Sequence, residues 1–153
     1  MAAAPPNSVE ILRLSDRPDH VATAAGWLFE QWGKDPLESY EAVLQDHDRR
    51  PAALLALSGG KPIGVVGFTR HQLEGQERDE LWINVLYVIT TWRKKGVGRW
   101  LVSEAVKSAR EFGAPMLYVY TDVPRFYEKD GWQKLRGADE HGSSLLRHAL
   151  EQV

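Results

Sequence analysis

The chain has 153 residues, of which 43% are hydrophobic and 26% charged, and it contains no cysteine. A chain of this length can bury about two thirds of its unfolded surface, so it can form a core without a disulfide or a structural metal. The absence of cysteine excludes disulfides, catalysis by a thiol and zinc sites built on cysteine.

The balance of charge argues against nucleic acid as a partner. Lys and Arg number 19 against 21 Asp and Glu, a formal charge of −2, whereas nucleic-acid binding relies on an excess of basic side chains. No apolar run approaches the roughly 20 residues that cross a membrane, so no membrane partner is expected. Residues 1–8 lack the basic start and apolar core of a signal peptide. We therefore expect a flexible tail at 1–8, one domain at 9–153 and a cytoplasmic location.

The first half of the domain predicts a strand, two helices and a hairpin. Residues 9–14 alternate between apolar and polar, as in a half-buried strand. Apolar side chains then recur at helical spacing over 17–33, which ends in glycine, and over 35–50, which has a proline at its first helical position. Two apolar runs around Ser58-Gly59-Gly60-Lys61 predict antiparallel strands joined by a tight turn.

The second half predicts a central strand at 81–89, the longest nearly continuous apolar run. A helix, a strand, a short helix and two strands follow, at 98–113, 116–120, 122–131, 132–137 and 143–150. The last segment fits a helix nearly as well as a strand. The order β-α-α-β-β-β-α-β-α-β-β predicts a single α/β (α+β) domain with a mixed central sheet of about six or seven strands flanked by helices.

The stretch WRKKGVGRW at 92–100 joins the central strand to the long helix. It lacks the Gly-Lys-Ser/Thr of a P-loop, and Leu101 stands where a dinucleotide fingerprint needs its third glycine. Its spacing, Arg93-x-x-Gly96-x-Gly98, could instead turn main-chain N–H groups toward a pyrophosphate at the helix N-terminus. The spacing by itself is also compatible with a solvated basic turn, in which the glycines serve only the backbone geometry.

Two segments together resemble the GNAT superfamily of N-acetyltransferases. LYVITTWRKKGVGRWLVSEAV is similar to that family's acetyl-coenzyme A segment, Arg/Gln-x-x-Gly-x-Gly/Ala after a central strand, and FYEKDGW is similar to its later aromatic segment. The element order also matches from Val9 onward. Two departures are visible: Lys94 replaces a frequent glycine, and Thr121 and Asp122 stand where many members have an asparagine.

The resemblance implies acetyl-CoA as cosubstrate and no metal. Main-chain groups of Leu86, Tyr87 and Val88 would bind the pantetheine arm where the strands at 81–89 and 116–120 splay apart. The pyrophosphate would lie on the turn and the start of the helix, formed by Arg93, Lys94, Lys95, Gly96, Val97, Gly98 and Arg99.

The resemblance also implies the catalytic groups. Tyr127 matches the family's tyrosine that protonates the leaving thiolate, and a phenol holds its proton at neutral pH. Glu80 stands where several members carry an acidic base, although a water chain or Asp122 could serve instead. Asn84, expected to point inward from the middle of the central strand, cannot accept the proton. Each residue also has a non-catalytic interpretation: Tyr127 as a packed core residue, and Glu80 as a solvated acid at the end of a strand.

The acceptor implied is an amine of a small molecule or a peptide, attacked directly in a ternary complex. Candidate substrate-binding residues are Trp27, Trp32 and Trp82, although aromatic residues at helical spacing are more often core. The five histidines show no metal-ligand spacing. A homodimer is one of the oligomeric states left open. The alternatives are a non-catalytic acyl-CoA-binding or regulatory module of the same fold and an unrelated nucleotide-binding α/β protein.

Overall fold

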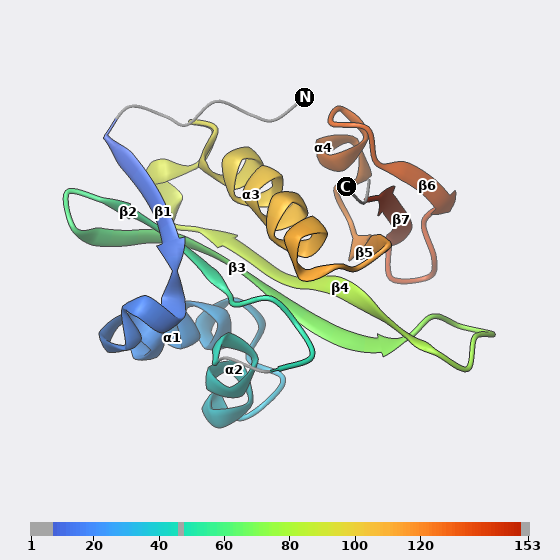
Figure 1. The fold of residues 1–153 in the computed structure, drawn as a ribbon. Helices are drawn as coiled ribbons and strands as arrows, with labels where there is room; N and C mark the ends of the chain where they lie inside the picture. The colour runs from blue at the N-terminus through green and yellow to red at the C-terminus, as the bar shows by residue number, and fades with distance from the viewer. Residues whose placement is uncertain (1–7, 46–47, 151–153) are drawn as a thin grey trace.

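One seven-stranded mixed sheet organises the protein, in the order β1-β2-β3-β4-β5-β7-β6 (Figure 1). The computed structural model describes residues 8–45 and 48–150. All neighbouring strands are antiparallel except β4 and β5, which are parallel and joined through α3. The elements are β1 Val9–Arg13, α1 Val21–Trp32, α2 Leu37–Leu44, β2 Leu54–Ser58, β3 Lys61–Gln72, β4 Asp79–Val88, α3 Val97–Phe112, β5 Met116–Thr121, α4 Pro124–Glu128, β6 Gln133–Arg136 and β7 Ser144–Ala149.

The predicted order of elements and the mixed sheet are confirmed. The segment that fitted both a strand and a helix is β7, which pairs with β5 over six residues and with β6 on its other side. Six cross-strand pairs outweigh the weak helical preference of a short exposed segment, because tertiary pairing overrides local propensity. The tail predicted at 1–8 lies outside the described residues except for Ser8.

Helices cover both faces of the sheet (Figure 1). On one face α3 and α4 enclose a core that includes Phe68, Leu101 and Leu146, and on the other α1 and α2 enclose a core that includes Leu28 and Val65. The alternation of side chains along β2, β3 and β4 divides their apolar residues between the two cores. Within the described residues, no helix is long and apolar enough to cross a membrane.

Strands β4 and β5 pair over only three residues each. Leu81, Trp82 and Ile83 face Leu117, Tyr118 and Val119, although β4 continues to Val88 and β5 to Thr121. Beyond Ile83, β4 keeps its antiparallel partner β3 on one side only. The two central strands therefore open from one another in the middle of the sheet.

A bulge lies at the start of this opening. Val85 pairs with Gly67 and Ile83 with Phe68, so Asn84 is an extra residue on β4. The expectation that Asn84 points inward was wrong, because the bulge interrupts the alternation of the strand and leaves Asn84 exposed. A Cβ on Gly67 would approach Val85 Cγ2 to 2.9 Å, so the close strand contact at the bulge requires glycine at this position.

Candidate active site

The turn between β4 and α3 presents main-chain donors. A 3₁₀ turn at Thr90–Trp92 leads into it, and Gly96, with φ of 89°, precedes the 16 residues of α3. Among the described residues, no acceptor receives a hydrogen bond from the main-chain N–H groups of residues 94–99. These donors, together with the partial positive charge of the helix N-terminus, can bind an anion.

Lys94 occupies a backbone conformation that suits glycine. Its φ is 63°, and apart from Ser8 it is the one non-glycine residue with positive φ in the described chain. A Cβ in this left-handed region costs roughly 1–2 kcal/mol. The resemblance placed a frequent glycine at this position, and the backbone gives the physical reason for it.

The four basic side chains of the turn differ in how they are held. Arg93 Nε donates to the Val88 carbonyl at 2.8 Å, and its guanidinium lies 5.3 Å from the centre of the Tyr87 ring. Lys95 Nζ lies 5.1 Å from the centre of the Trp92 ring, and Lys94 is exposed. Arg93 and the two lysines therefore surround the donors with positive charge.

Arg99 makes an ion pair across the site, between α3 and the residues after α4. Its Nη2 donates to Asp130 Oδ1 at 2.6 Å and its Nε to Oδ2 at 2.9 Å. These hydrogen bonds lower the pKa of Asp130 and raise that of Arg99. Asp130 therefore already neutralises the charge of Arg99, and a cofactor bound by Arg99, as predicted, would compete with Asp130 for the guanidinium.

The predicted pantetheine residues lie on the part of β4 that has separated from β5. Leu86, Tyr87 and Val88 pair with β3 on one side. Leu86 and Val88 contact the core under α3, whereas Tyr87 faces α1, where its ring centre lies 5.7 Å from that of Trp27. Their main-chain edge toward β5 is open, because the β4–β5 ladder has ended.

Tyr127 lies in α4, on the same side of the sheet as α3. Its side chain is 4% exposed, with ring centres of Phe126 and Trp132 at 5.1 and 5.2 Å. Burial, and then the negative charge of Asp122, raise the pKa of the Tyr127 phenol. The hydroxyl has no hydrogen-bond partner among the described residues. It is therefore a neutral proton donor available to a bound group.

Two residues close to Tyr127 in the chain, to which the sequence reasoning gave no role, make contacts that position α4. Thr121 Oγ1 accepts from the Val123 N–H at 3.0 Å, which fixes the turn into α4 at the place of the missing asparagine. Phe126 packs toward α3, because a Cβ on Gly98 would lie 3.6 Å from its ring. The motif FYEKDGW contained the signal for Phe126, but the contact with Gly98 required the fold.

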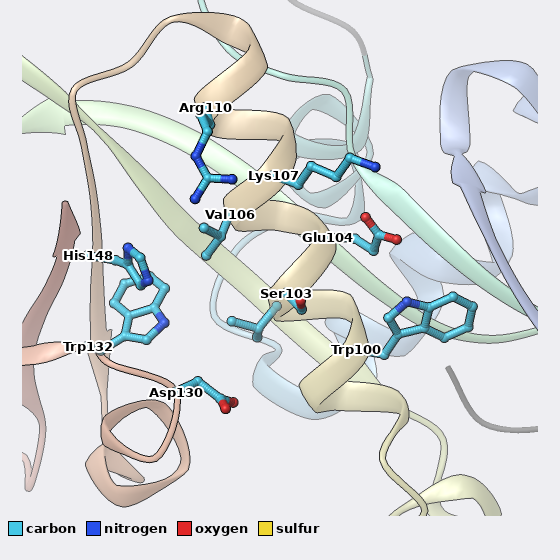
Figure 2. A pocket seen from close by; sticks show the side chains of 10 residues that line it. Trp100, Ser103, Glu104, Val106, Lys107, Arg110, Asp130, Trp132 and His148 are labelled. Carbon is cyan, nitrogen blue, oxygen red and sulfur yellow. The ribbon is translucent and has the colours of Figure 1, made fainter. Parts of the chain in front are cut away.

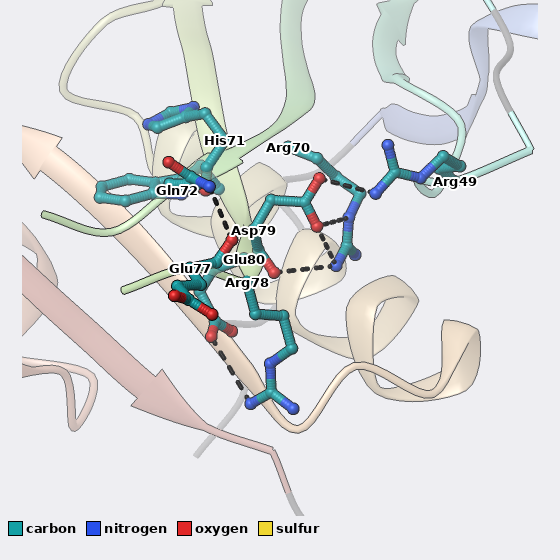
Figure 3. A network of polar contacts seen from close by, with 9 residues as sticks. Arg49, Arg70, His71, Gln72, Glu77, Arg78, Asp79 and Glu80 are labelled. Atoms are coloured by element: carbon teal, nitrogen blue, oxygen red, sulfur yellow. Dashed lines mark hydrogen bonds and ion pairs between the residues drawn. The ribbon is translucent and has the colours of Figure 1, made fainter. Parts of the chain in front are cut away.

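Glu80 lies near the start of β4, within a polar network (Figure 3). Its carboxylate is 3.8 Å from Arg78 and its side chain is 13% exposed. The adjacent Asp79 accepts from Arg49 at 2.6 Å and from Arg70 at 3.2 Å, and these hydrogen bonds lower its pKa. Glu80 precedes the last β5-paired residue, Ile83, by three positions, about 10 Å along the strand. Any proton transfer between Glu80 and the opening would need water.

The three predicted substrate tryptophans lie in different surroundings. Trp27 contacts Tyr87 on the α1 side of the sheet, and Trp32, at the end of α1, is 43% exposed. Trp82 is 6% exposed, stacks on His71 with ring centres 4.2 Å apart and donates to the His71 carbonyl at 3.0 Å. The structure therefore brings Trp27 to Tyr87, in the part of β4 that has separated from β5, but packs Trp82 into an aromatic cluster with Tyr118.

Histidine and acidic side chains form no group of three or more that could hold a metal ion, as far as residues 8–45 and 48–150 are concerned. His47 lies outside those residues. Of the others, His71 stacks on Trp82, and His148 makes an edge contact with Trp132.

Comparisons with known proteins agree with this geometry. A sequence model of the acetyltransferase (GNAT) family matches residues 11–132. Similar solved structures include an aminoglycoside 6'-acetyltransferase type Ii, with 19% identity, a TM-score of 0.73 and coverage of 94% of this chain and 99% of that one. NAA60 of Arabidopsis thaliana, in complex with a bisubstrate analogue, has 16% identity, a TM-score of 0.72 and coverage of 95% and 99%. A GNAT acetyltransferase of Streptococcus pneumoniae has 20% identity, a TM-score of 0.68 and coverage of 94% and 99%.

The backbone of Lys94 yields a stability prediction. Lys94→Gly should raise the free energy of unfolding by about 0.5–1 kcal/mol, because glycine adopts a positive φ without a clash of Cβ. Lys95→Gly removes the same charge from a neighbour whose φ is not positive, and should lower the free energy of unfolding by roughly 0.5 kcal/mol. Urea denaturation measures both variants, and a change of the same sign in both would contradict the interpretation.

Proposed function

The chain belongs to the acetyltransferase (GNAT) family, and from this premise we propose that it is an N-acetyltransferase. It transfers the acetyl group of acetyl-CoA to an amine of a small molecule or a peptide, by direct attack in a ternary complex. The observation that carries the proposal is the combination of main-chain donors at residues 94–99 with an opening between β4 and β5. Together they suit a ligand with a pyrophosphate and an amide-containing arm.

The donors fit the anionic part of coenzyme A. A pyrophosphate needs several N–H groups and positive charge, and residues 94–99 offer unpaired donors at the start of α3 with Lys94 and Lys95 beside them. The edge of β4 at Leu86, Tyr87 and Val88 has no strand partner toward β5 and can pair with the amides of an extended arm as another strand would, except at the Val88 carbonyl, which accepts from Arg93 Nε. The fold thus contains acceptors and donors suited to both parts of the molecule.

Acetyl-CoA supplies an activated thioester when bound, so the protein has few chemical tasks. A main-chain N–H of β4 beyond the bulge polarises the carbonyl oxygen as negative charge develops on it. Tyr127 is the proposed proton donor to the departing sulfur, and burial, which raises its pKa, keeps the phenol protonated at physiological pH. One group belongs to β4 and the other to α4, which both contribute to the core on the α3 side of the sheet.

The amine must lose a proton during the attack. Glu80 is proposed as the base, acting through water because the paired residues of β4 separate it from the opening. Asp122 is the other acid, near enough for its charge to raise the pKa of Tyr127. The acceptor class remains an amine of a small molecule or a peptide. Similar folds include an aminoglycoside acetyltransferase and a NatC complex bound to a Gag peptide and CoA. Trp27, which contacts Tyr87 of β4, is the aromatic residue proposed to contact the acceptor.

Gly98→Asp tests the pyrophosphate site without removing the helix. The new Cβ meets only ordinary contacts at 3.6 Å, and an acidic residue in the first turn favours a helix. Its carboxylate would repel the pyrophosphate, so calorimetry should show coenzyme A binding weakened by about 10- to 100-fold. Gly137→Asp, in open space after β6, adds the same charge as the control. Equal affinities in the two variants would refute the pyrophosphate site.

Tyr127→Phe tests the proton donor. Turnover should fall by about 100-fold, whereas the affinity for coenzyme A should stay the same, because the ring and its packing remain. Tyr118→Phe removes a hydroxyl from another buried tyrosine, next to Trp82, and should leave turnover unchanged. Coenzyme A release with a panel of amines measures both. Full turnover by Tyr127→Phe would show that Tyr127 is not the proton donor. If the unaltered protein bound coenzyme A tightly but formed no free coenzyme A from acetyl-CoA with any amine, a non-catalytic acyl-CoA-binding module would be favoured.

A further inference from the structure

A cavity lies on the side of α3 that faces β7 and the residues after α4 (Figure 2). It has a volume of about 510 Å³, within the range of small-molecule sites. Its residues include Ser103, Val106 and Arg110 of α3 and, opposite them, Trp132 and His148. Arg110 follows Gly98 by twelve helical positions, about 18 Å along the axis. The far end of the cavity is therefore remote from the donors at residues 94–99.

Arg110 gives this far end a positive charge that no acid among the described residues neutralises. Its guanidinium makes no ion pair or hydrogen bond within the described residues, and its Nε is closed off from solvent without an acceptor. Figure 2 shows the guanidinium on the side of α3 that faces His148 and Trp132. An arginine held by packing beside a cavity can offer its remaining N–H groups to a ligand.

The other polar groups around the cavity are mostly donors or already engaged. The Trp132 indole N–H can only donate, and among the described residues it has no acceptor. Asp130 is bound by Arg99. Glu104 and Lys107 also line the cavity, but their charged ends lie on the side of α3 away from Arg110 (Figure 2). Donors without acceptors select a ligand that brings its own acceptor oxygens.

Apolar side chains line other parts of the cavity. Val106 projects from α3, and the Trp132 ring, stacked edge-on with His148 at 5.4 Å, closes the opposite side. We propose that this cavity binds a small organic anion, whose carboxylate or phosphate pairs with Arg110 and whose apolar body packs on Val106 and Trp132. The proposal does not depend on the proposed acetyl transfer.

The test is an NMR titration of the full chain with benzoate and with phenyl phosphate, using benzamide as the uncharged counterpart of benzoate. Either anion should shift the Trp132 indole resonance saturably, with a Kd of about 1 mM or tighter, and the tighter of the two identifies the preferred head group. Benzamide should cause no saturable shift. Failure of both anions to shift Trp132, or shifts confined to the amides of residues 94–99, would overturn the proposal.

Three variants locate the interaction. Arg110→Gln should weaken anion binding by at least about tenfold, because a charge-assisted hydrogen bond is lost. Lys107→Gln changes the charge equally on the same helix. Lys107 also lines the cavity, but it is exposed and its side chain extends away from Arg110 (Figure 2), so the Kd of this variant should stay within about twofold of that of the unaltered protein. Val106→Phe keeps all charges, fills part of the cavity and should also weaken binding. Equal Kd values for Arg110→Gln and Lys107→Gln, or undiminished binding by Val106→Phe, would contradict the site.

Discussion

The limited pairing of β4 with β5 is the constraint on which the proposed site depends. A buried strand normally satisfies its main-chain N–H and C=O groups on both sides, and an unpaired buried group costs free energy. Here the ladder ends after Ile83, while β4 continues for five more residues. The open edge of β4 therefore requires another partner, which solvent or an extended ligand can provide.

Several local features keep the opening in place. The bulge at Asn84 shifts the register of β4 where the strands separate, and Gly67 permits the close approach of β3 there. On the α3 side, a Cβ on Gly64 would meet a Leu101 methyl at 3.0 Å, so the helix packs directly on the strand. The Arg99–Asp130 ion pair connects the start of α3 to the end of α4. These contacts set the relative positions of the turn donors and Tyr127.

The sequence predicted the parts of the site that local patterns encode. Periodicity gave the order of strands and helices, and the spacing of Gly96 and Gly98 identified the turn, because these signals act over a few residues. The bulge that exposes Asn84, the burial of Trp82 and the pairing of Arg99 with Asp130 depend on partners distant in the chain. The positive φ of Lys94 was hidden for another reason: lysine rarely adopts it, so only the resemblance indicated an unusual position. The Arg110 cavity likewise combines residues from α3, the end of α4 and β7.

A crystal structure of the protein with coenzyme A tests the central claim most directly. The account predicts pyrophosphate oxygens within hydrogen-bond distance of main-chain N–H groups of residues 94–99, and a pantetheine arm beside Leu86, Tyr87 and Val88 where β4 has left β5. The sulfur should then lie near the Tyr127 hydroxyl. Coenzyme A bound elsewhere, or an arm that does not enter between β4 and β5, would contradict the account.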